Sequence, residues 1–130
     1  MLPHSAEQIP ELKHIDLWES YVLGWEHKGD ELFIYIEAVL LPEHQAYEKP
    51  TPELWACYKK ARLLFKGVSS LEGYEELDIE KAATDASGEK DFGHIEEFQF
   101  TVLGDYSFNI EYAGLLKFKA KEVKIELTNV

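Results

Sequence analysis

The chain has 130 residues, which fits one domain over residues 1–130 and allows about two thirds of the unfolded chain's surface to be buried. Its 45% hydrophobic and 29% charged residues are typical of a soluble globular protein and argue against disorder. The 25 acidic residues against 13 basic ones give a formal charge of −12, and Arg62 is the only arginine, so we expect no binding to nucleic acid.

Cysteine and hydropathy patterns point to an intracellular protein. Cys57 is the only cysteine, which excludes an intrachain disulfide. No apolar run approaches the 18 residues of a membrane span, and the first residues lack the pattern of a signal peptide. We therefore expect a cytoplasmic location and no membrane contact.

The stretch from Trp18 to Leu41 predicts a β-hairpin that organises the fold. Its second strand has apolar residues at every even position, which indicates one wholly buried face: Leu32, Ile34, Ile36, Ala38 and Leu40. A turn at Gly29-Asp30 pairs Trp25 with Ile34 and Leu23 with Ile36, which would place Tyr21, Leu23 and Trp25 on that buried face.

The segments on either side of this hairpin give weaker patterns. Pro10 favours a short helix near the N-terminus, and the prolines from Pro42 to Pro52 predict a surface connection. Residues 52–60 fit both a helix and a strand. We favour a strand from about Ala61 to Val68, with a helical turn near Pro52 as the local alternative.

An acidic stretch and a loop follow. Leu71 to Glu80 carries five acids around Tyr74, Leu77 and Ile79, a composition typical of a partly exposed edge strand whose charges prevent pairing with other chains. Thr84 to Gly93 is rich in Asp, Ser and Gly and predicts a loop.

The last third predicts three strands. Phe98, Phe100 and Val102 alternate with polar residues, and so do Tyr106, Phe108, Ile110 and Tyr112. The apolar residues of both strands fall on the same face only if the loop has an odd number of residues, and we assign this loop to Leu103–Asp105. The apolar phase then slips by one residue near Lys121-Glu122, which predicts a β-bulge, with a tight turn as the alternative.

About seven short strands separated by turns predict an all-β fold, with at most one or two short helical turns. The architecture that we expect is an antiparallel β-sandwich or a partly open barrel. Aromatic residues in such a domain mostly fill the core.

No residue pattern indicates a reaction, a cofactor or a metal. The five histidines lack metal-ligand spacing, Cys57 has no cysteine partner, and Asp91-Phe92-Gly93 stands without the other kinase motifs. A nucleophile with a paired base is likewise absent from the sequence. We interpret the histidines as surface residues and Cys57 as a buried packing residue.

Several stretches resemble those of small uncharacterised bacterial β proteins. They are Trp18-x-x-Tyr21-x-x-Gly24-Trp25-x-x-x-Gly29-Asp30, Trp55-x-Cys57-Tyr58, Ala61-Arg62-Leu63, Phe65-x-Gly67-Val68 and Asp91-Phe92-Gly93-x-Ile95. Some proteins of this kind are similar to immunity proteins encoded beside polymorphic toxins. The resemblance implies a binding role without a catalytic site.

The leading hypothesis is a non-enzymatic, acidic interaction protein, immunity-like in kind, that binds a basic protein partner. The alternative is a small-ligand-binding β domain or an unrecognised enzyme with a site between the sheets. For the interaction surface we single out exposed aromatic and acidic candidates: Trp18, Tyr35, Tyr47, Tyr58, Glu72, Glu75, Glu76 and Asp78.

Overall fold

The computed structural model describes residues 4–5, 9–79, 83–84 and 90–128. Apart from one 3₁₀ turn at Pro10–Leu12, the regular elements in these ranges are strands. Their bounds are β1 (His4–Ser5), β2 (Ile15–Lys28), β3 (Glu31–Leu40), β4 (Cys57–Lys66), β5 (Ser69–Glu72), β6 (Ala83–Thr84), β7 (Lys90–Asp91), β8 (Ile95–Phe100), β9 (Asp105–Ile110), β10 (Gly114–Lys119) and β11 (Glu122–Leu127).

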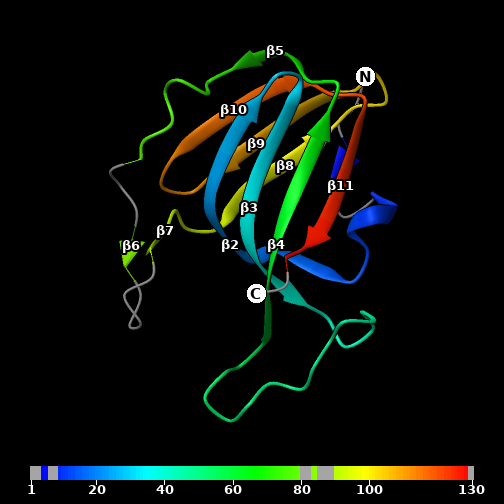
Figure 1. The fold of residues 1–130 in the computed structure, drawn as a ribbon, viewed down its shortest axis with the longest axis vertical. Helices are drawn as coiled ribbons and strands as arrows, with labels where there is room; N and C mark the ends of the chain where they lie inside the picture. The colour runs from blue at the N-terminus through cyan, green and yellow to red at the C-terminus, as the bar shows by residue number, and fades with distance from the viewer. Residues whose placement is uncertain (1–3, 6–8, 80–82, 85–89, 129–130) are drawn as a thin grey trace.

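The strands form two antiparallel sheets that face each other (Figure 1). The front sheet has the order β11-β4-β3-β2, and the back sheet has the order β1-β8-β9-β10-β5. The short strands β6 and β7 pair only with each other in the described residues. The predicted all-β class is confirmed. Because neither sheet closes on itself, the arrangement is sandwich-like.

The hairpin of β2 and β3 has the predicted turn and buried face. Gly29 has a φ of +58° while Asp30 has a negative φ, as a type II′ turn requires, and Lys28 pairs with Glu31. Trp25 lies opposite Ile34, as predicted. The predicted even-numbered residues of β3 are all buried.

A β-bulge corrects the rest of the predicted register. The pairing shifts between Val22 and Gly24, so Val22 lies opposite Ile36 where Leu23 was expected. Tyr21 then pairs with Glu37, whose side chain is on the outer face. The expectation that Tyr21 faces the core is therefore wrong, because the extra residue of the bulge inverts the faces of the residues that precede it in β2, up to the next register shift between Asp16 and Tyr21.

The connection from β3 to β4 is irregular, as its prolines predicted. Residues 41–56 lack regular structure, and residues 52–60 contain a turn followed by the start of β4. Pairing with β3 continues to Leu40 opposite Cys57, so β4 begins four residues before the predicted strand start at Ala61. The described residues of this stretch contain no helix.

The predicted acidic edge strand is shorter and earlier than expected. β5 lies at an edge of the back sheet, where Glu72 pairs with Lys117 of β10, but the strand ends at Glu72. Beyond it, the N–H of Glu76 bonds to the Gly73 carbonyl and that of Leu77 to the Tyr74 carbonyl. These turn bonds replace the sheet ladder in the described part of the predicted strand beyond Glu72, and Glu80, its last residue, lies outside the described residues.

The hairpin of β8 and β9 has a three-residue loop, the odd number expected from its apolar pattern. The N–H of Thr101 bonds to the Asp105 carbonyl, and the N–H of Gly104, at φ +86°, bonds to the Thr101 carbonyl. This is the pattern of a three-residue loop over Val102–Gly104, one residue earlier than predicted. Val102 is consequently 68% exposed instead of extending the buried face.

The phase slip near Lys121 marks a change of sheet, which corrects the predicted β-bulge. The N–H of Ala120 bonds to the Gly104 carbonyl beside the back sheet, whereas the N–H of Lys121 bonds to the Lys66 carbonyl of the front sheet. β10 and β11 therefore belong to different sheets. Each has its own phase because each faces the core from the opposite side.

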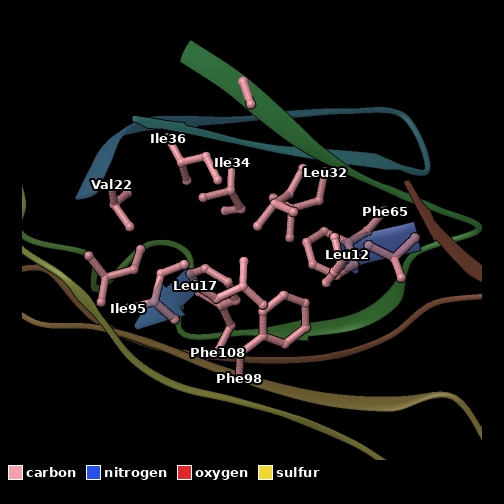
Figure 2. Close-up of a cluster of buried hydrophobic side chains, with 14 of the residues drawn as sticks. Leu12, Leu17, Val22, Leu32, Ile34, Ile36, Phe65, Ile95, Phe98 and Phe108 are labelled. Carbon is pink, nitrogen blue, oxygen red and sulfur yellow. The ribbon is translucent and has the colours of Figure 1, made fainter. Parts of the chain in front are cut away.

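The core is a layer of side chains between the two sheets. Figure 2 shows Ile34 and Ile36 of the front sheet facing Phe98 and Phe108 of the back sheet. The Phe65 ring lies with its centroid 5.7 Å from Phe98 and 4.9 Å from Phe118, so aromatic contacts link the sheets. Side chains thus fill the middle of the sandwich, where the alternative hypothesis expected a site.

Candidate functional site

The residues singled out for interaction lie in three places. Tyr35 and Tyr58 are on the outer face of the front sheet, opposite Arg62 and Val39. Trp18 and Tyr47 are half-buried and pack against the core. The acids Glu72, Glu75 and Glu76 are exposed and Asp78 is half-buried, all beside the back-sheet edge. The structure therefore brings the two tyrosines together on the front sheet and the exposed acids together beside the back-sheet edge, in separate places.

The outer face of the front sheet is open in the described part of the chain. Figure 1 looks onto this face, and none of the described segments crosses it. The ladder places Phe33, Tyr35 and Glu37 of β3 beside Leu64, Arg62 and Lys60 of β4. Half-buried aromatic rings thus occupy a surface that polar residues normally cover in a solvated sheet.

Arg62 is held in the middle of this face. Its guanidinium carbon lies 5.2 Å from the centroid of the Phe33 ring, and its Nε is 2.8 Å from Glu126 Oε1. The hydrogen bond to the Glu126 carboxylate raises the pKa of Arg62, so the charge is permanent. Next to it, the Tyr35 hydroxyl donates to Glu26 Oε1 at 3.1 Å.

A row of aromatic side chains runs along one end of the same face. Trp55 meets the Tyr58 ring edge-on at 5.9 Å, Tyr58 lies 6.4 Å from Tyr21, and Tyr21 lies 4.4 Å from the His94 ring. We call Trp55, Tyr58, Tyr21 and His94 the aromatic row. Trp55, at 67% exposed, is its most accessible member.

Carboxylates surround the aromatic row. Burial, then Asp91, Glu19, Glu37 and Glu111, raises the pKa of the Tyr21 phenol above its ordinary value. The pKa of Tyr58 is also raised, by burial, by Tyr21 and by Glu37 and Glu19. Lys60 lies opposite Glu37 in the ladder, and Glu111 Oε1 is 3.3 Å from His94 Nδ1, so two cationic groups offset part of this negative charge when His94 is protonated.

Backbone bonds fix the His94 end of the row. The N–H of Val22 donates to the Gly93 carbonyl and the N–H of Phe92 to the Val22 carbonyl, at 2.9 and 2.8 Å. The N–H of Tyr112 donates in turn to the Phe92 carbonyl. The segment around Asp91-Phe92-Gly93 therefore joins the edge of the front sheet to the end of β9. Its likeness to a kinase motif has no part in this role.

The sequence pointed to Tyr58 but missed most of the aromatic row. Trp55 is not among the residues singled out for interaction, and Tyr21 was expected in the core. His94 was interpreted as a surface residue like the other histidines, and its carboxylate partner is Glu111, seventeen residues away. Neither the bulge that turns Tyr21 outward nor a pairing over that distance leaves a local signal in the sequence.

Hollows at the surface offer further sites. A groove of about 610 Å³ lies over the outer face of the back sheet and is lined by Gln99, Ser107, Lys117 and Glu72, which form one row across four strands. A second hollow, of about 490 Å³, lies between His27 and the segment from Leu71 to Glu76. Its acids and the aromatic row belong to different parts of the surface.

The described residues show no group of three or more His, Cys, Asp or Glu side chains that could hold a metal ion. Cys57 is buried, and its Sγ accepts a hydrogen bond from the N–H of Glu48 at 3.4 Å. Within the described ranges, no helix is long and apolar enough to cross a membrane.

Comparison of the chain with models of protein families, with curated proteins and with solved structures finds no match. Function must therefore be argued from the chain's own surface and charge.

Proposed function

We propose that this protein is a non-enzymatic interaction protein that binds a basic protein partner through the outer face of its front sheet. The observation that carries the proposal is the open four-stranded face with half-buried Phe33, Tyr35 and Tyr58 and a central Arg62. Tyrosine, tryptophan and arginine are the residues that most often dominate the binding energy of protein interfaces.

The rigidity of this face supports the proposal. Phe33 and Glu126 hold the Arg62 guanidinium, and Glu26 holds the Tyr35 hydroxyl, so these side chains lose little further freedom when a partner binds. Preorganised side chains lower the entropic cost of association.

The charge of the protein favours a basic partner. A formal charge of −12 attracts cationic proteins over distances comparable to the Debye length and raises their association rate. An acidic protein that captures a basic one also fits the resemblance to immunity proteins of polymorphic toxins. The immunity-like role is the particular form of the proposal, and the identity of the toxin lies beyond it.

The direct test is affinity capture with the immobilised full chain from a lysate of the source organism, followed by mass spectrometry. We expect one enriched protein with a basic isoelectric point, retained at low salt and weakened at high salt. Arg62→Ala should reduce its retention, while Lys119→Ala, which removes an exposed cation of β10 that is likewise paired with a carboxylate but lies on the back sheet, serves as the matched control. Failure to enrich a basic protein would contradict the proposal.

A second candidate is the binding of a small polar ligand in the groove over the back sheet. Its volume of about 610 Å³ lies within the range of about 300–1,000 Å³ found for ligand sites, and Gln99, Ser107 and Lys117 supply donors and acceptors. A thermal-shift screen of sugars, nucleosides and amino acids tests it. A hit whose shift disappears in Gln99→Ala supports this candidate, and a screen without hits removes it.

A further inference from the structure

We infer that the aromatic row receives a lysine or arginine side chain of the basic partner. The inference rests on the proposed function and assigns one contact within it. The three rings of Trp55, Tyr58 and Tyr21 follow each other at 5.9 and 6.4 Å along one end of the outer face. The electron-rich faces of such rings attract ammonium and guanidinium groups.

The exposure of Trp55 supports a role in binding. Its side chain is 67% exposed, although it stands in contact with the Tyr58 ring at an angle of 88°. An indole that is held edge-on against a phenol offers a large apolar surface at little conformational cost. The ring is thus accessible to a side chain that approaches the open face of the sheet.

The carboxylates around the row select a cation over other occupants. Glu19 and Glu37 act on both Tyr21 and Tyr58, and Asp91 and Glu111 act on Tyr21. Four carboxylates against Lys60 and His94 leave the site negative, so an anionic or phosphate-bearing group is repelled. Aromatic faces beside carboxylates form the arrangement that proteins use to recognise ammonium groups.

The site is held in place from both sheets. Tyr58 belongs to β4, Tyr21 lies opposite Glu37 of β3, and His94 is fixed by the bonds that join Phe92–His94 to β2 and to the end of β9. Only Trp55 stands on the irregular connection of residues 41–56. The rings of Tyr58 and Tyr21 are therefore already in position before a cation binds. The Trp55 ring would contact the cation from one side.

The test uses blocked tripeptides Gly-Lys-Gly and Gly-Arg-Gly, with Gly-Glu-Gly and Gly-Leu-Gly as comparison peptides, in NMR titrations of the full chain. We expect the Trp55 indole and Tyr58 amide resonances to shift with the two cationic peptides only. Trp55→Ala should weaken this binding by about two- to fivefold, the effect of one exposed cation–π contact. Glu19→Gln, which changes charge but not shape, should weaken it as well.

Matched controls separate the row from general electrostatics. Leu103→Ala removes a side chain that is 69% exposed at the tip of the β8–β9 hairpin, and Glu96→Gln removes an exposed carboxylate of β8. Both should leave the titrations unchanged. Equal shifts with Gly-Glu-Gly, or a loss in the controls as large as that in Trp55→Ala and Glu19→Gln, would overturn the inference.

Affinity capture with the same variants distinguishes this inference from the proposed function. If the wild type and Trp55→Ala retain a basic partner equally, the function stands and the assignment of the row falls. If retention drops in Trp55→Ala but not in Leu103→Ala, both stand. If the wild type captures no basic partner, the proposed function falls, and with it the assignment of the row to a partner's side chain.

Discussion

The Ser20 hydroxyl accepts a hydrogen bond from the backbone N–H of Val39 at 3.0 Å and donates its own to the Asp16 carbonyl at 2.7 Å. Ser20 is fully buried, and the β2–β3 register shifts between Asp16 and Tyr21 around it. A side chain thus replaces the ladder bonds that this irregular part of β2 cannot make, which satisfies buried backbone groups.

Ser20→Ala should destabilise the protein by about 1–3 kcal/mol, because it leaves a buried N–H and a partly buried carbonyl without this partner. The free energy of unfolding from urea titration measures the loss. Ser69→Ala, at an exposed position of β5, is the control and should change stability by no more than about 0.5 kcal/mol. Equal effects of the two changes would mean that the Ser20 bonds contribute nothing to stability.

Ile34→Ala should cost about 2–5 kcal/mol through lost burial and the cavity that it leaves, because the Ile34 side chain is fully buried in the core between the two sheets. That is a large part of a typical stability of about 5–15 kcal/mol. Glu37→Ala, on the opposite face of β3, should cost about 0–1 kcal/mol. Urea titrations that give Glu37→Ala the larger cost would contradict the assignment of faces.

The sequence was sufficient to predict the features of the fold that depend on whether a residue position or a loop length is odd or even. The even positions of β3 all face inward, and the odd loop between β8 and β9 brings Phe98 opposite Phe108. Both follow from the strict alternation of side chains in a strand. The turn at Gly29 was predictable too, because a residue with a left-handed backbone conformation is usually glycine.

Bulges and changes of sheet were not predictable, because the pattern fits more than one geometry. Tyr21, Val22, Leu23 and Trp25 are apolar at both parities, so alternation could not locate the extra residue that turns Tyr21 outward. The slip near Lys121 likewise fits a bulge and a change of sheet equally well. Long-range hydrogen bonds of Ala120 and Lys121 decide between them.

The candidate site was less predictable than the fold. Tyr35 and Tyr58 were singled out as exposed aromatics, yet Trp55, Tyr58, Tyr21 and His94 come together only because β2, β4 and the segment after β7 meet at one end of the front sheet. Contacts between such distant segments depend on the tertiary fold. Composition gives the net charge of the chain but not the places on the surface where the charged side chains lie.

Cys57 should react slowly with a thiol reagent in the native protein. Its side chain is 5% exposed, and its Sγ accepts the Glu48 N–H, so the reagent must wait for a local opening. Labelling with Ellman's reagent in buffer and in denaturing urea measures the protection. Rapid labelling in buffer, at the rate seen in urea, would contradict the burial of Cys57.

The Tyr21 phenol should lose its proton at a higher pH than a free tyrosine, because burial and then the Asp91 carboxylate raise its pKa above 10.0. Between 10.0 and the raised value, the folded state holds a proton that the unfolded state has released. The contribution of Tyr21 to stability is therefore complete below about pH 10 and is lost as the pH rises through the folded-state pKa. Ultraviolet titration of phenolate absorbance and urea midpoints at increasing alkaline pH measure the two effects.

Tyr21→Phe should remove part of the alkaline loss of stability. Asp91→Asn should lower the Tyr21 pKa, whereas Glu96→Gln should leave it unchanged. An identical Tyr21 titration in Asp91→Asn and in the wild type would show that Asp91 does not act on the phenol.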